Sequence, residues 1–305
     1  MNTEYEVIII GGGPAGLSAG LYTSRGRLKS LLLEKRLVGG QVTDAEVVEN
    51  YPGLAGGISG MELGQQMHQQ ATKYGLETLL AEVTGLELQR EKRVVITNKG
   101  RFTAKAVIIA SGSDRRKLGV PGEEEFTGKG VSYCATCDGP FFKERVVAVV
   151  GGGNAAISEA LHLVKFASRV KVIHHRDKLR ATPILQERAS ADSKIEFLWN
   201  TRVEGIMGKG MVKQLNLKNV TTGEKSTLDV AGIFVAIGRE PNTNFLKGIL
   251  PLDSTGYIIT NEKMETKIAG IFAAGDVRQD SARQAITAAG DGATAAINAE
   301  KFISQ

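Results

Sequence analysis

The chain has 305 residues, of which 42% are hydrophobic and 23% charged, and its formal net charge is +5. This length favours about two globular domains, and two cysteines in so long a chain exclude a disulfide-stapled secreted scaffold. The lysines and arginines are scattered, with no run of five basic residues, so we expect no nucleic-acid binding; a mildly basic surface that attracts an acidic protein partner fits the charge better.

The first residues are acidic and lead into a short apolar run, Val7–Ile10. They lack the basic region that begins a secretory signal, and the run is too short to span a bilayer. We therefore expect a cytoplasmic protein without a membrane partner.

The same pattern occurs twice in the chain: an apolar run, a glycine-rich turn and a helix that begins with small residues. The turns lie at 11–16 and 151–156, after runs at 5–10 and 146–150. Non-alternating apolar runs are typical of parallel strands buried on both faces. The spacing Gly-x-Gly-x-x-small is typical of dinucleotide-binding turns, in which the second glycine lets the backbone approach a pyrophosphate. The sequence therefore predicts two nucleotide sites.

Each copy continues into a second apolar run, and the residue that ends this run differs between them. Glu34 lies 18 residues after Gly16, whereas His174 lies 18 residues after Ala156. A carboxylate here accepts hydrogen bonds from ribose hydroxyls and repels a 2′-phosphate, so the first copy suits the adenosine of FAD or NAD. The second copy offers Arg176 and Arg180, which can pair with a 2′-phosphate and favour NADPH over NADH. The alternative is that these arginines only solvate a loop.

The two cysteines, Cys134 and Cys137, stand just before the second glycine turn and are separated by two residues. Such a pair can close a small disulfide whose thiolate form is easily stabilised, and its place between two nucleotide sites suggests a path for electrons. Asp138 is a candidate proton donor and acceptor, although an aspartate before Gly139-Pro140 is also ordinary turn chemistry. One pair of cysteines without paired histidines predicts no metal site.

The remaining segments complete two α/β units. Further strands are expected at 93–97, 106–110, 231–239 and 270–277, and a small-residue helix is expected from Arg283 onward. We expect one nucleotide domain to be inserted into another. The expected boundaries are 1–116 and 246–305 for the FAD-binding domain and 117–245 for the NAD(P)H-binding domain with the cysteine pair.

Taken together, these motifs resemble those of the low-molecular-weight thioredoxin reductases of bacteria and plants, over essentially the whole chain. The motifs are Gly11-x-Gly13-x-x-Gly16, Gly39-Gly40-Gln41, Glu49-Asn50-Tyr51-Pro52-Gly53, Cys134-Ala135-Thr136-Cys137-Asp138-Gly139, Gly151-x-Gly153-x-x-Ala156, Gly275-Asp276 and Arg283-Gln284-Ala285. The resemblance implies two Rossmann-like three-layer nucleotide-binding domains, the second inserted into the first. It also implies FAD and NADPH as cofactors, thioredoxin as the protein substrate, and a homodimer.

Site residues follow from the resemblance by position. It implies that Cys137 lies nearer the flavin, that Cys134 is the outward nucleophile, and that the inserted domain rotates on segments near 115–117 and 238–245. The implied FAD contacts are Gly11, Gly13, Ala15, Gly16, Glu34, Gly40, Gln41, Asn50, Gly275, Asp276, Arg283, Gln284 and Ala285. The implied NADPH contacts are Gly153, Asn154, Ala156, His175, Arg176 and Arg180.

Two positions depart from the family pattern. His175 stands where the family commonly has an arginine, which weakens the preference for NADPH or admits NADH. Ala282 stands where an aromatic residue is common. The alternatives to a thioredoxin reductase are a related flavin disulfide reductase with another donor or another dithiol partner, an oxidase that passes electrons to oxygen, and a non-catalytic flavin redox sensor.

Overall fold

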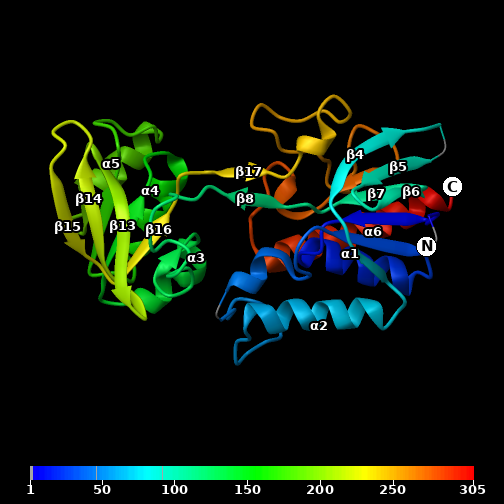
Figure 1. Cartoon of the computed structure of the whole chain (residues 1–305), viewed down its shortest axis with the longest axis horizontal. Coiled ribbons are helices and arrows are strands. Elements are labelled where there is room, and N and C mark those ends of the chain that lie inside the picture. Colours follow the sequence, from blue (N-terminus) through cyan, green and yellow to red (C-terminus); the bar gives the residue numbers. More distant parts are fainter. Residues whose placement is uncertain (1–2, 46, 91) are drawn as a thin grey trace. The chain divides into compact units, whose positions relative to one another are not determined.

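The computed structural model describes residues 3–45, 47–90 and 92–305, and the chain divides into two compact units. The first unit contains the chain up to Asp114 and Glu240–Gln305, and the second, green to yellow in Figure 1, contains Arg115–Arg239. The boundaries expected from the sequence, after residues 116 and 245, lie a few residues further along the chain than these.

The first unit is built on a parallel five-stranded sheet with the strand order β18-β7-β1-β2-β3. Strands β1, β2 and β7 are buried along their whole length, as their unbroken apolar runs predict. The five strands are β1 (Val7–Ile10), β2 (Ser30–Glu34), β3 (Glu77–Leu80), β7 (Ala106–Ile109) and β18 (Ile271–Ala273).

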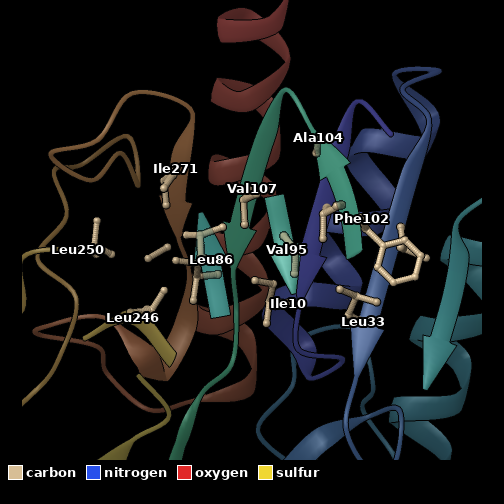
Figure 2. Close-up of a cluster of buried hydrophobic side chains, with 14 of the residues drawn as sticks. Ile10, Leu33, Leu86, Val95, Phe102, Ala104, Val107, Leu246, Leu250 and Ile271 are labelled. Carbon is tan, nitrogen blue, oxygen red and sulfur yellow. The ribbon is translucent and has the colours of Figure 1, made fainter. Parts of the chain in front are cut away.

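Each face of this sheet is covered by a different kind of layer. Helices α1 (Pro14–Arg25), α2 (Gly60–Thr72) and α6 (Ala285–Ile303) pack on one face. The other face carries an antiparallel sheet of β4 (Val83–Leu88), β5 (Arg93–Thr97) and β6 (Gly100–Ala104). Figure 2 shows the core between the two sheets, where Leu86, Val95 and Phe102 meet side chains of β1, β2, β7 and β18.

The second unit repeats this architecture. Its parallel sheet has the order β12-β11-β10-β16-β9, with helices on one face and an antiparallel sheet on the other. The parallel strands are β9 (Val131–Ser132), β10 (Val146–Val150), β11 (Arg169–Ile173), β12 (Ile195–Leu198) and β16 (Gly232–Val235). The covering elements are α4 (Asn154–Leu163), α5 (Pro183–Ala191), β13 (Thr201–Lys209), β14 (Met211–Asn219) and β15 (Lys225–Asp229).

Short elements complete the chain. Strands β8 (Ser113–Arg115) and β17 (Arg239–Pro241), at the two crossings between the units, pair with each other. The others are α3 (Ala135–Asp138) and the 3₁₀ turns η1 (Gly40–Asp44), η2 (Gly139–Phe142), η3 (Asn244–Leu246) and η4 (Gly275–Val277). Across the described ranges, no helix combines the length and apolar character needed to cross a membrane.

Candidate functional site

The first glycine loop joins β1 to α1. Two of its glycines leave no space for a side chain, whereas the space around a third is open. A Cβ on Gly11 would lie 2.3 Å from the Ala110 carbonyl oxygen, and one on Gly16 would lie 1.8 Å from the Gly11 oxygen. Gly11 also has φ +109°, so these positions admit only glycine. Around Gly13, at the N-terminus of α1, the nearest atoms to such a Cβ are 4.0 Å away. The open position leaves room for a pyrophosphate at the helix N-terminus.

The second loop, between β10 and α4, has the same form. Gly151 has φ +148°, and a Cβ there would lie 2.4 Å from the Ala236 oxygen. Ala156 is fully buried against this turn. Gly153 has no atom within 4 Å of the Cβ position. Both loops therefore fit a dinucleotide at the same relative position.

The middle glycine of each loop has a role that the sequence reasoning missed. The Gly12 N–H donates to Glu34 Oε2 at 2.6 Å, and Glu34 Oε1 accepts from the Arg36 N–H at 2.8 Å. A Cβ on Gly152 would lie 2.4 to 2.5 Å from ring atoms of His174. Glu34, the last residue of β2, and His174, the residue after β11, thus both pack on the glycine loop of their own unit, besides any role toward a ribose. The signal was present as a third glycine in each Gly-Gly-Gly.

Other FAD candidates gather around the first loop. The Gly39 N–H donates to the Gly12 oxygen at 2.8 Å, and a Cβ on Gly40 would lie 2.8 Å from the Gly13 Cα. Gln41 Nε2 donates to the Ser113 oxygen at 2.7 Å. The candidates from the first loop and from η1 therefore lie together.

The C-terminal candidates lie near the first loop, since a Cβ on Gly275 would lie 2.9 Å from the Ala15 Cβ. Asn50 Nδ2 donates to Gln284 Oε1 at 3.2 Å, and Asp276 Oδ1 accepts from the Ser281 hydroxyl at 3.0 Å. Gln284 is the N-cap of α6, Ala285 is its first residue, and Arg283 has φ +57°. The helix expected from Arg283 thus begins two residues later, because the left-handed backbone at Arg283 cannot belong to it.

The NADPH candidates surround the second loop. Asn154 Oδ1 accepts from the Thr182 N–H at 2.8 Å, and the Arg180 N–H donates to the Gly152 oxygen at 2.6 Å. Arg176 Nε donates to His175 Nε2 at 3.3 Å. Burial, followed by the charges of Arg176 and Arg180, lowers the pKa of His175. The free protein therefore presents cationic arginines beside a neutral imidazole.

The two cysteines form a disulfide, with their Cα atoms 5.3 Å apart. They follow β9, at the carboxyl edge of the second parallel sheet, and α3 begins directly after Cys134. The Cys137 N–H donates to Cys134 Sγ at 3.2 Å. After reduction, this donor favours the thiolate form of Cys134, which is the nucleophilic form.

Asp138, the last residue of α3, has a perturbed carboxyl. Burial raises the pKa of Asp138, while the Ser132 hydrogen bond and the positive charge of Arg115 oppose the rise. The Ser132 hydroxyl donates to Asp138 Oδ2 at 2.6 Å and accepts from the Cys134 N–H at 3.1 Å. Nothing in the sequence indicated that Ser132 links the carboxyl to the first cysteine.

A buried acid anchors the segment that leads into the cysteines. Glu123 is 1% exposed and accepts from the Tyr133 hydroxyl at 2.9 Å and from the N–H groups of Leu118 and Gly119. The Arg115 guanidinium lies 5.0 Å from the Tyr133 ring centre. In the described part of the chain, no three His, Cys, Asp or Glu side chains gather as metal ligands would.

Comparison with known proteins gives consistent matches. The model of the pyridine nucleotide-disulphide oxidoreductase family matches residues 5–292. A thioredoxin reductase of Peptoclostridium acidaminophilum is 44% identical over 309 residues, covering 99% of this chain and 98% of that protein. A thioredoxin reductase of Bacillus subtilis is 45% identical over 302 residues, covering 99% of this chain and 95% of that protein. The crystal structure of thioredoxin reductase from Streptococcus pyogenes matches with a TM-score of 0.96 at 43% identity, covering 100% of this chain and 99% of that one.

Proposed function

The chain belongs to the low-molecular-weight thioredoxin reductases of the pyridine nucleotide-disulphide oxidoreductase family, and from that premise we propose how its residues pass electrons from NADPH, through FAD and the Cys134–Cys137 disulfide, to thioredoxin. The observation that carries the proposal is the disulfide beside Asp138, in a unit that also contains a dinucleotide loop. The reduced cofactors, when bound, supply the electron pair that opens this disulfide.

We assign FAD to the first unit and NADPH to the second. Support for FAD comes from the open position at Gly13, the carboxylate of Glu34 beside it, and the approach of Gly40, Gly275 and Asn50 to the same region. Support for NADPH comes from Gly153, Arg176 and Arg180 around the second loop.

The dithiol then reduces thioredoxin in two exchanges. The Cys134 thiolate attacks one sulfur of the thioredoxin disulfide, which forms a mixed disulfide and releases a thioredoxin thiolate. Cys137 Sγ next attacks Cys134 Sγ, which re-forms the Cys134–Cys137 bond and releases the second thiolate. Both released thiolates take up a proton, and the proton of Cys137 must leave. Asp138, adjacent in sequence and buried, is the group that we propose moves these protons.

The preference for NADPH is expected to depend on Arg176. Loss of a charge-assisted contact to the 2′-phosphate in Arg176→Ala should lower kcat/KM for NADPH by about 10- to 100-fold and leave the NADH value unchanged. The reverse change, His175→Arg, adds a second guanidinium and should strengthen the preference. Steady-state kinetics with both nucleotides measure this. Arg101→Ala, an exposed arginine paired with Glu87 in the first unit, is the control. Equal losses with both nucleotides would contradict the assignment.

Thioredoxin is expected to contact Phe141, which lies in η2, the turn that follows the cysteine pair and Asp138, and is 54% exposed. Removing this ring in Phe141→Ala should raise the KM for thioredoxin by about tenfold or more, as loss of an aromatic anchor does, without changing ferricyanide reduction by NADPH. The adjacent Phe142 is the contrast. It is 8% exposed and lies edge-on to Phe234 at 5.3 Å, so Phe142→Ala should cost about 3–5 kcal/mol of stability instead. An unchanged KM in Phe141→Ala would contradict the docking role.

The central test is an anaerobic titration of the purified protein with NADPH and with NADH, followed by thioredoxin. Bleaching of the flavin band by NADPH, recovery on addition of thioredoxin, and insulin reduction in the coupled assay are expected. Oxygen consumption without insulin reduction would indicate an oxidase instead.

The proposal also includes a homodimer in a reducing, cytoplasmic setting, where the cysteine pair can cycle through its dithiol form. A surface hollow of about 290 Å³, lined by polar and apolar side chains of α1, α2 and α6, is the contact that we propose for a second copy.

A further inference from the structure

A largely buried ion pair connects α6 to the turn that carries Asp276. Asp291, in the middle of α6, is 8% exposed and accepts from Arg278 Nε at 2.6 Å and from Arg278 Nη2 at 3.0 Å. The same carboxylate accepts from the Gly275 N–H at 3.1 Å. The remaining Arg278 nitrogen, Nη1, donates to the Gln279 oxygen at 3.2 Å. Both charged groups are thus bound within the first unit.

Asp291 is unusual for its position in α6. The buried residues of α6 around Asp291 are small, and most of them are alanine. Burying two charges costs free energy that their attraction offsets only with good geometry, and a hydrophobic pair of the same size is often as stable. Stability alone is therefore a weak reason for an aspartate at this position. The third hydrogen bond of its carboxylate, from the Gly275 N–H, is a more specific reason.

The Gly275 turn lies at a crowded junction. Gly275 has φ +75°, and a Cβ there would lie 2.9 Å from the Ala15 Cβ at the start of α1. A Cβ on Gly292, the residue after Asp291, would lie 2.0 Å from the Ala15 oxygen. The turn, α6 and the N-terminus of α1 therefore touch with no spare space. A small shift of the turn moves Asp276 relative to the helix N-terminus that faces a dinucleotide.

We propose that Asp291 and Arg278 are positioning residues for the flavin dinucleotide. The bidentate pair fixes the Gly275–Val277 turn on α6. This turn then holds Asp276 beside the N-terminus of α1. This inference rests on the proposed function only in assigning FAD to the first unit. Neither residue needs to contact the cofactor, because the bonds of both carboxylate oxygens run to Arg278 and to the turn.

The test compares FAD affinity with stability of the apoprotein. In Asp291→Asn with Arg278→Gln, no unpaired charge remains buried, so the melting temperature of the apoprotein should change little. The Kd for FAD, measured by quenching of flavin fluorescence on reconstitution, should rise by about 10- to 100-fold, the range seen when outer-shell partners are removed at metal sites. Arg278→Lys keeps the charge but loses the two parallel bonds, and it should also weaken FAD binding.

The matched control is Glu87→Gln with Arg101→Gln, which removes an exposed ion pair of the same unit and should leave the Kd unchanged. A wild-type Kd in the double variant or in Arg278→Lys, whatever happens to the melting temperature, would overturn the inference. If the wild-type apoprotein took up no FAD at all, the proposed function would fail first, and the inference with it.

Discussion

Replacing Cys134 and Cys137 together with serine is expected to lower the rate of thioredoxin reduction by about 10⁴-fold or more, because no other sulfur in the chain can take up the electrons. The insulin-coupled assay with NADPH and thioredoxin measures the loss. Flavin content and melting temperature should stay near those of the wild type, because both side chains are only partly buried. Thioredoxin turnover at the wild-type rate in this variant would refute the electron path.

The single variants separate the two sulfurs. In Cys137→Ser the Cys134 thiol keeps its N–H donor from residue 137 and should still attack a thioredoxin with one active-site cysteine carried as a mixed disulfide with 5-thio-2-nitrobenzoate. Release of the yellow thiolate and a covalent complex on a non-reducing gel are the readouts. Cys134→Ser should release far less of the yellow thiolate. Thr136→Ser, an exposed position between the cysteines, is the control and should keep full activity.

The parts of the site that the sequence predicts are those fixed by local backbone geometry. Gly11 and Gly16 follow from spacing, since their neighbours leave no space for a Cβ, and the cysteine pair is visible directly. The ion pair of Arg278 with Asp291 was not predictable, because it depends on how α6 packs on the turn. The same holds for Ser132, since only the fold of the loop brings its hydroxyl to Asp138.

The unit boundary shows the same limit. Gly238, in the second unit, and Pro241, in the first, both mark a break near the second crossing, and the sequence does not say which of the turns around them carries it. The structure divides after Arg239, where β17 pairs with β8, because strand pairing between distant segments decides the point.

Replacing Asp138 with asparagine is expected to lower the rate of thioredoxin reduction by about 10²- to 10⁴-fold, the usual contribution of a general acid or base. Burial raises the pKa of Asp138, so the protonated carboxyl persists above the ordinary aspartate range. The wild-type rate should therefore fall as pH rises through this raised pKa. The pH–rate profile of Asp138→Asn should not show this fall. Ferricyanide reduction by NADPH needs no thiol exchange and should not change.

The protonation of Asp138 also predicts how stability varies with pH. A carboxyl with a raised pKa in the folded state contributes stability that is present below its unfolded pKa and is lost as pH rises through the folded value. The wild-type melting temperature should lose this contribution over that range, whereas Asp138→Asn should not. Ser132→Ala removes a bond that favours the ionised carboxyl, so it should move the fall in rate to higher pH. A pH–rate profile identical in wild type, Asp138→Asn and Ser132→Ala would leave Asp138 with only the role of a turn residue.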